Sequence, residues 1–183
     1  MAGAVATPAQ VLDFWFGAGP DKWFSKDDAF DAAIRERFLP SYEAAAAGRL
    51  TDWEAAPESA LALVIVLDQF PRNMFRGSPR IFAADALGLA VAKRAVAQGF
   101  DRRLDLPKRN FFYLPFMHSE NLADQERGIE LSRQNADQNT LKYAELHADI
   151  IRRFGRFPHR NPVLGRSTTA EEKAFLDGGG FAG

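Results

Sequence analysis

The sequence predicts an all-α fold, and three observations support this class. Apolar residues recur three or four positions apart, as in the series Phe30, Ile34 and Phe38, which places them on one face of a helix. Proline and glycine divide the chain into segments of helical length. No segment alternates apolar and polar residues with a period of two, and no strand–helix–strand alternation is present. We therefore expect about eight helices in an antiparallel array.

The first part of the chain contains three predicted helices. A Thr-Pro pair supplies a cap and a first-turn proline for a short helix over residues 7–17. A second helix covers residues 27–47, and Pro40 should kink it or split it. The third helix covers residues 57–70 and should end there, because Pro71 disfavours helical geometry in the residue before it.

A Ser-Pro pair then opens a long predicted helix over residues 78–99. A helical wheel places four apolar residues of this segment on one face: Ile81, Leu89, Ala92 and Val96. Asp85 falls in the middle of that face. A carboxylate in such a position should be paired, be protonated or mark a site.

The last third of the chain reads as an aromatic segment at residues 107–115 followed by three helices. The first reaches about residue 135, the second ends at Gly155, and the third is a short helix opened by a Thr-x-x-Glu capping box. The candidate starting residues are Ser119 or Asn121 for the first, Asn139 or Thr140 for the second, and Thr168 or Thr169 for the third.

Length and composition limit the class of protein. A chain of 183 residues suits one well-packed core, so we expect a single all-helical domain over residues 1–183, frayed at 1–7 and 178–183. Sixteen phenylalanines predict a large aromatic core. A net charge of −1 gives no general attraction to nucleic acid or to an anionic membrane. The absence of cysteine excludes disulfides and thiolate chemistry. With no signal-peptide pattern and no apolar run of membrane-spanning length, we expect a cytoplasmic protein.

The segment 67–77 gathers polar residues directly behind the most apolar predicted helix. Asp68 lies on the same helix face as buried apolar residues, and Arg72 and Arg76 lie in the connection to the helix that carries Asp85. A compact hairpin would bring both arginines to both acids, and a guanidinium can bind a carboxylate through two hydrogen bonds. The arrangement is either a structural ion-pair network or a network with one arginine left to hold an anionic ligand.

A second polar segment covers residues 154–161. Between residues 150 and 170 there are five arginines and no acid, and Phe154, Phe157 and Pro158 alternate with them. This loop should therefore pack against the body of the protein, and it either has a purely structural role or binds a phosphate or carboxylate.

The third polar segment is His118-Ser119-Glu120. It is either a helix start or a site in which His118 acts as a base or, with Glu120, as a metal ligand. No paired-histidine metal motif and no glycine-rich phosphate loop is present, so the sequence predicts no metal and no cofactor. His147 lies on an apolar helix face, where a hydrogen-bonded core histidine is the commoner interpretation.

Five separated segments, in order along the chain, resemble the uncharacterised bacterial and fungal proteins catalogued as domain of unknown function 924. They are residues 11–16, 67–77, 82–85, 116–120 and 154–166, within a resemblance that spans about residues 11–176. The resemblance implies an all-helical, tetratricopeptide-like α–α superhelix and no established activity, substrate or cofactor. Its motif positions supply the candidate binding residues: Asp68, Gln69, Arg72, Asn73, Arg76, Asp85, His118, Glu120, Arg156, His159, Arg160 and Asn161.

These features lead to three functional hypotheses. The favoured one is a binding module with an arginine-rich polar pocket for an anionic small molecule or peptide. The first alternative is a small hydrolase or transferase in which His118 or His159 acts as general base, Glu120 or Asp68 orients it and arginines stabilise negative charge. The second is a structural ion-pair network in a protein that acts through its outer surface. None of the three includes nucleic acid or a membrane as partner.

Overall fold

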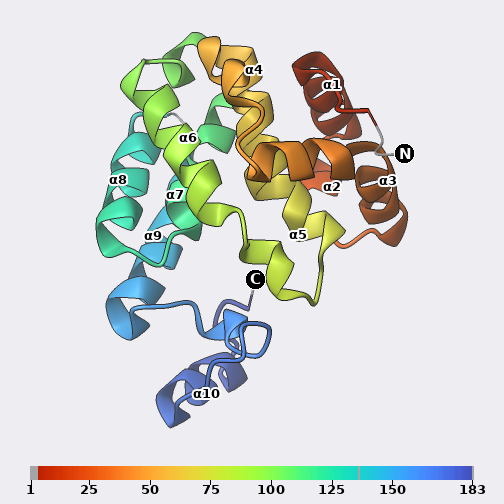
Figure 1. Cartoon of the computed structure of the whole chain (residues 1–183). Coiled ribbons are helices and arrows are strands. Elements are labelled where there is room, and N and C mark those ends of the chain that lie inside the picture. Colours follow the sequence, from red (N-terminus) through yellow and green to blue (C-terminus); the bar gives the residue numbers. More distant parts are fainter. Residues whose placement is uncertain (1–3, 136, 183) are drawn as a thin grey trace. The chain divides into compact units, whose positions relative to one another are not determined.

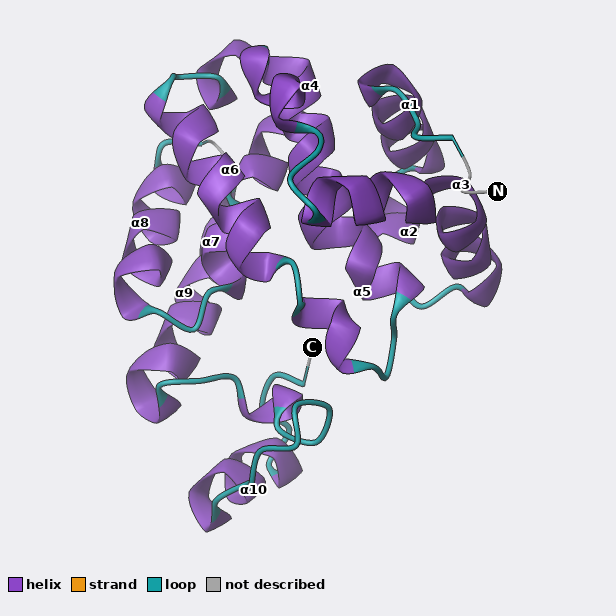
Figure 2. Cartoon of the chain, in the orientation of Figure 1, coloured by secondary structure: helices purple, strands orange, loops and turns teal. Residues whose placement is uncertain are grey.

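A computed structural model of the chain describes residues 4–135 and 137–182, and every regular element in these ranges is helical (Figure 2). The predicted all-α class is therefore confirmed. The chain divides into two compact units, the first ending at Pro115 and the second beginning at Phe116. No helix of the described residues is both long enough and apolar enough to cross a membrane.

The first unit consists of helices that pack in sequence-distant pairs (Figure 1). Its α-helices are α1 (Pro8–Ala18), α2 (Pro20–Trp23), α3 (Asp28–Ala46), α4 (Pro57–Val64), α5 (Phe70–Met74) and α6 (Asp85–Ala97). Helix α1 packs on α4, α3 packs on α5, and α4 packs on α6. Helix α7 (Leu114–His118) carries the chain from the first unit into the second.

An aromatic core holds the first unit together, as the phenylalanine content predicts. The Trp15 ring lies 6.0 Å from Phe30, 5.8 Å from Phe70 and 5.9 Å from Phe111, measured between ring centroids. Phe38 completes this cluster at 4.8 Å from Phe70. Rings at these separations add specific edge and stacking contacts to the burial of apolar area, so α1, α3 and α5 are fixed relative to one another.

Helix α3 continues through Pro40 and does not split. Proline lacks the N–H that would bond to the preceding turn, which is why a break was expected. Phe38 and Tyr42 are buried on either side of Pro40. Their packing stabilises one continuous helix across the missing hydrogen bond.

The helix that begins at Pro57 does not end at Phe70. A π-helical turn over Ile65–Gln69 follows α4, and α5 then continues to Met74. In this turn the Phe70 N–H bonds to the carbonyl of Ile65, five residues back. Pro71 consequently falls in the first turn of a new α-helical segment, where its missing N–H costs little.

The predicted helix over residues 78–99 is also shorter than expected. Ser78 caps a 3-10 turn at Pro79–Phe82, and α6 begins only at Asp85. Asp85 therefore lies in the first turn of α6, where the helix dipole favours a carboxylate. The buried face of α6 is also different from the predicted one and consists of Gly88, Val91, Ala92 and Ala95. Helix α6 packs on α4 and on the π turn, and a Cβ at Gly88 would lie at an ordinary contact distance of 3.4 Å from the Cβ of Leu67.

The second unit contains α8 (Leu122–Arg133), α9 (Gln138–Phe154) and α10 (Ala170–Asp177), and α8 packs on α9. Asn121 caps α8, Gly155 ends α9 in the left-handed conformation, and the predicted capping box at 169–172 is present. Asp137 caps α9 in place of the expected Asn139 or Thr140, because its carboxylate accepts from both of their N–H groups. One hydrophobic cluster of this unit is formed by Ile150, Ile151 and Phe157, with Phe154, Phe175 and Phe181 packed against it.

The expectation of frayed ends falls partly on residues 1–3 and 183, which lie outside the described ranges. Within those ranges, the Ala6 N–H donates to the Ser41 hydroxyl at 2.9 Å. Phe181 packs against His147 with 4.6 Å between ring centroids. The expectation of a single domain stays a prediction, and each unit is described by itself.

Candidate functional site

The first polar cluster lies at the π turn. The carboxylate of Asp68 is fully buried and accepts a 2.6 Å hydrogen bond from the side-chain amide of Gln69. Arg72 donates to both carboxylate oxygens of Asp85, at 3.0 and 3.1 Å, and its Nη1 lies 3.4 Å from Asp68 Oδ1. The predicted two-bond contact between an arginine and a carboxylate is confirmed for this pair.

The charge of Arg72 is compensated inside this cluster. Burial by itself would lower the pKa of Arg72, but the carboxylates of Asp68 and Asp85 outweigh it and raise the pKa above its ordinary value. Arg72 also donates to the backbone carbonyl of Asp68 at 2.5 Å. Its interactions therefore stabilise the π turn and its junction with α6.

Arg76 does not contact Asp68 or Asp85, which corrects the expectation that both arginines would serve both acids. It donates instead to Asp31 on α3, from Nε at 2.5 Å and from Nη2 at 3.2 Å. Asn73 donates its side-chain amide to the same carboxylate at 2.7 Å. The pairing differs because α5 packs on α3. The side chains of Asn73 and Arg76 therefore face α3, whereas Arg72 faces α6.

A pocket of about 290 Å³ adjoins Arg76. We call it the Arg76 pocket, and its lining residues are Lys26, Asp28, Asp31, Ala32, Arg35, Asn73 and Arg76. All of these residues belong to the first unit. Arg35 donates Nε to the carbonyl of Met74 at 3.1 Å and also donates Nη2 to it, so its guanidinium is fixed at the pocket.

The remaining candidate residues lie in the second unit, where Glu120 and Glu172 are the two centres of a polar network. Glu120 accepts from Arg166 at 2.8 and 3.0 Å and from the Phe157 N–H at 2.8 Å. Burial would raise the pKa of Glu120, but these hydrogen bonds outweigh it and lower the pKa. Arg156 binds Glu172 through two bonds of 2.6 and 2.9 Å.

The cationic stretch over residues 150–170 is paired with groups elsewhere in the second unit. Asn161 is buried between the two centres, accepting from Arg166 at 2.9 Å and donating to Glu172 at 3.1 Å. The contacts of the five arginines are Asp149 for Arg152, Glu171 for Arg153, Glu172 for Arg156, the His118 carbonyl for Arg160 and Glu120 for Arg166. These contacts hold the loop within the second unit, and the choice between a structural role and an anion site stays a prediction.

The three histidines have different surroundings. His147 is buried on α9 and its Nδ1 lies 2.7 Å from the Tyr143 carbonyl, which confirms the hydrogen-bonded core interpretation. His159 packs among aromatic rings, 5.7 Å from Phe157 and 5.5 Å from Phe181. Burial, reinforced by the nearby charge of Arg160, lowers the pKa of His159 from 6.5 to about 4, so the ring is neutral at pH 7. His118 is half-buried at the end of α7.

Comparison with known families places the chain in a recognised group. The family model described as bacterial protein of unknown function, DUF924, matches residues 11–180. The chain belongs to the DUF924 family. A search of curated proteins gives no match.

A solved structure agrees with this assignment. The structure of a protein of unknown function from Agrobacterium tumefaciens is similar to this DUF924 chain, with 47% sequence identity and a TM-score of 0.91. The similarity covers 93% of this chain and 97% of the Agrobacterium chain.

The candidate binding residues fall into two sets, one in each unit. Asp68, Gln69, Arg72, Asn73, Arg76 and Asp85 belong to the first unit, and His118, Glu120, Arg156, His159, Arg160 and Asn161 belong to the second. Their convergence on one shared cavity stays a prediction. Within the described residues, no group of three or more His, Asp or Glu side chains is arranged to hold a metal ion.

Sequence reasoning missed several residues of these clusters, namely Lys26, Asp31, Arg35, Arg166 and Glu172 as site members. One signal was available for Asp31. It lies three and seven positions before Ile34 and Phe38, on the apolar face of α3, as Asp68 and Asp85 do on theirs. Lys26 and Arg35 are exposed in the chain and carry no comparable signal.

Proposed function

We propose that this DUF924 protein is a binding module for a small anionic group, which it holds in the Arg76 pocket. The observation that carries the proposal is the convergence of three cationic side chains, Lys26, Arg35 and Arg76, on one small pocket. Asp28 and Asp31 also line it, so three positive groups against two negative groups leave a formal excess of one positive charge. An anion entering the pocket would neutralise this excess.

Hydrogen bonds within the protein orient the guanidinium groups of Arg35 and Arg76 before a ligand binds. Arg35 uses Nε and Nη2 on the Met74 carbonyl, and Arg76 uses Nε and Nη2 on Asp31. Within the described residues, no protein acceptor engages Nη1 of either side chain, so both groups are available to a ligand. Donors fixed in advance lose less conformational entropy on binding. Guanidinium N–H groups also match the oxygens of carboxylates and phosphates.

The size of the pocket selects among anions. A volume of about 290 Å³ lies just below the range of roughly 300–1,000 Å³ that is typical of small-molecule sites. The pocket therefore suits a phosphate group, a small carboxylic acid or the acidic side chain of a peptide. The carboxylates of Asp28 and Asp31 would disfavour an anion large enough to contact both.

The hydrolase or transferase alternative has less support from the geometry. Neither His118 nor His159 lines the Arg76 pocket. The two acids that could orient a histidine are engaged elsewhere, Glu120 by Arg166 and Asp68 by Arg72. A low pKa of about 4 also makes His159 a weak base.

Two finer parts of the sequence interpretation belong with this proposal. The all-helical class and the family resemblance support a tetratricopeptide-like superhelix, which is the first of these parts. A cytoplasmic location, where phosphorylated and carboxylated metabolites are available as ligands, is the second of these parts.

The experiment is an anion titration followed by calorimetry and by the thermal unfolding midpoint, with inorganic phosphate, citrate and an acidic peptide as probes. We expect at least one anion to release heat and to raise the midpoint, since a ligand that binds only the folded state stabilises it. Arg76→Gln should abolish both effects. Arg49→Gln removes an exposed arginine that does not line the pocket and should preserve them.

Two results would refute the proposal. One is that none of the probes binds or stabilises the wild-type protein. The other is that an anion binds and Arg49→Gln weakens it as much as Arg76→Gln does, because the response would then reflect general charge and not the pocket.

A further inference from the structure

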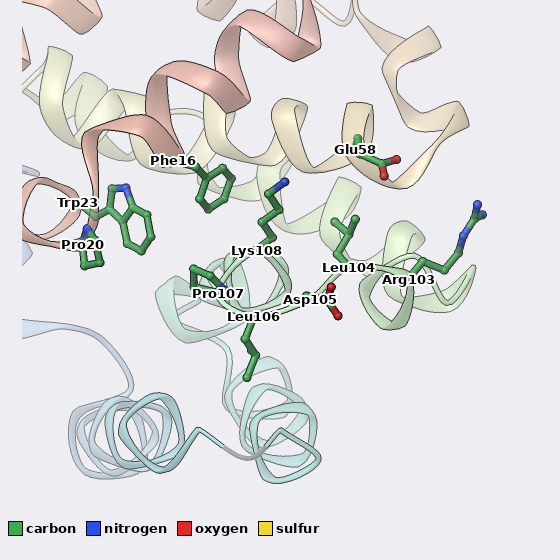
Figure 3. Close-up of a pocket in the computed structure, with 10 residues that line it drawn as sticks. All are labelled: Phe16, Pro20, Trp23, Glu58, Arg103, Leu104, Asp105, Leu106, Pro107 and Lys108. Atoms are coloured by element: carbon green, nitrogen blue, oxygen red, sulfur yellow. The ribbon is translucent and has the colours of Figure 1, made fainter.

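The first unit contains a second pocket, separate from the Arg76 pocket, with a volume of about 600 Å³ (Figure 3). Its lining combines rings, apolar residues and charges: Phe16, Pro20, Trp23, Glu58, Arg103, Leu104, Asp105, Leu106, Pro107 and Lys108. Figure 3 shows an aromatic end formed by Phe16, Pro20 and Trp23, and Glu58 and Arg103 at the opposite end. Lys108 lies between the two ends. We call this site the amphipathic pocket.

The aromatic end is rigid. The Trp23 indole donates to the Trp15 carbonyl at 2.7 Å, and its ring stands edge-on to Phe111 with 5.1 Å between centroids. Phe16 contacts both of these rings, at 5.6 Å from Trp23 and 5.4 Å from Phe111. These contacts fix the ring positions, so the pocket presents flat apolar surface without having to rearrange.

The lining of the pocket includes two groups of each charge sign, the acids Glu58 and Asp105 and the cations Arg103 and Lys108. Within the described residues, none of the four side chains forms an ion pair with the protein. Both cations lie over rings, Lys108 at 5.6 Å from the Phe16 centroid and Arg103 at 5.8 Å from that of Phe100. Both signs of charge are therefore available to a ligand next to an apolar surface.

We infer that the amphipathic pocket binds a small zwitterion with an aromatic body, of the chemical class of a free aromatic amino acid. The ring would pack against Phe16 and Trp23, and the carboxylate would contact Lys108 beside them. The ammonium would contact the carboxylates of Glu58 and Asp105. The volume lies well inside the range typical of small-molecule sites, and a few polar groups at one end of an apolar pocket are the usual means of orienting a ligand. This inference does not depend on anion binding in the Arg76 pocket.

The test is a calorimetric comparison of three probes on the full chain. L-Phenylalanine carries both charges, 3-phenylpropionate lacks the ammonium, and 2-phenylethylamine lacks the carboxylate. We expect L-phenylalanine to bind, and each truncated probe to bind at least about tenfold more weakly, the equivalent of one charge-assisted hydrogen bond.

Charge-specific variants then assign the contacts. Lys108→Gln should weaken the binding of the two probes that carry a carboxylate, L-phenylalanine and 3-phenylpropionate, and leave the binding of 2-phenylethylamine unchanged. Glu58→Gln should weaken the binding of the two probes that carry an ammonium, L-phenylalanine and 2-phenylethylamine, and leave the binding of 3-phenylpropionate unchanged. Lys142→Gln, an exposed lysine of the second unit, is the matched control and should change none of them. Both pocket residues are exposed, so the variants should keep the wild-type unfolding midpoint.

Two outcomes would overturn the inference. Failure of L-phenylalanine to bind would remove it directly. Equal binding of all three probes would show a general apolar surface and not a zwitterion site. The same conclusion would follow if Lys108→Gln and Glu58→Gln weakened the binding of every probe equally.

Discussion

Arg76 donates two hydrogen bonds to Asp31, which lies 45 residues earlier in the chain. This pair links the segment after α5 to α3, and Asn73 strengthens the link by donating to the same carboxylate. The side chain of Asp31 is 12% exposed and that of Arg76 is 38% exposed. The acid is therefore buried as a fixed anchor, and the arginine extends from it into the pocket.

We expect Asp31→Ala to lower the free energy of unfolding by about 1–3 kcal/mol, because two donors lose a largely buried acceptor. Chemical denaturation measures this change. Asp28→Ala is a suitable control, since Asp28 lines the same pocket but its side chain is 87% exposed. An equal effect of the two substitutions would show that Asp31 has no special structural role.

Asp85→Ala should lower the free energy of unfolding by about 2 kcal/mol. It removes both bonds from Arg72 and the acid in the first turn of α6, although Arg72 keeps Asp68 at 3.4 Å. Asp149→Ala breaks an exposed pair with Arg152 and should change the value by no more than about 0.5 kcal/mol. A wild-type stability for Asp85→Ala would mean that the pair contributes nothing.

Glu172 should contribute to acid sensitivity in a defined interval. The Arg156 guanidinium and the Thr169 N–H lower the pKa of Glu172 from 4.5 to about 2. Between these values the unfolded chain binds the proton and the folded chain does not, so stability falls as the pH drops from 4.5 toward 2. In Glu172→Gln the thermal unfolding midpoint should change less with pH over this interval. Substitution of the exposed neighbour, Glu171→Gln, should leave the pH dependence of the midpoint as in the wild type. Parallel curves for the wild type and Glu172→Gln would contradict the assignment.

His159 should make stability depend on pH in a higher interval than Glu172 does. Its folded pKa of about 4 lies below the ordinary 6.5, so protonation favours the unfolded chain and stability is lost as the pH falls from 6.5 toward 4. His159→Phe keeps a ring among Phe157 and Phe181 but cannot titrate. Its unfolding midpoint should vary less than that of the wild type over this interval. A steeper dependence would show that His159 is not the titrating group.

Local signals were sufficient for most helix starts. The capping residues Thr7, Asn121 and Thr169 bond through their side chains to N–H groups two or three residues away. The sequence therefore identified Thr7 and narrowed each of the other two caps to a pair of candidates. The failures have different causes. A π turn places Pro71 in a position that needs no N–H, and Ser78 caps a 3-10 turn that precedes α6. The start of α9 was missed although its cap, Asp137, is itself a local signal.

In the candidate site, too, contacts between residues close in sequence were predictable and contacts that depend on helix packing were not. The pair of Arg72 and Asp85 was predictable because both residues flank one connection. The pair of Arg76 and Asp31 was not, because it depends on how α3 packs on α5, which no spacing in the sequence specifies. For the same reason Lys26 and Arg35 could not be assigned to a pocket with Arg76.

The most direct test of the anion-binding account is the dissociation constant of the anion that binds wild-type protein most tightly, phosphate or citrate, measured by calorimetry on Arg35→Gln. Arg35 bonds to a backbone carbonyl and not to a carboxylate, so its removal changes the charge of the pocket and leaves the Asp31 pair intact. The account predicts at least about tenfold weaker binding, the loss of one charge-assisted hydrogen bond, with Arg49→Gln as the unaffected control. An unchanged dissociation constant for Arg35→Gln would contradict it.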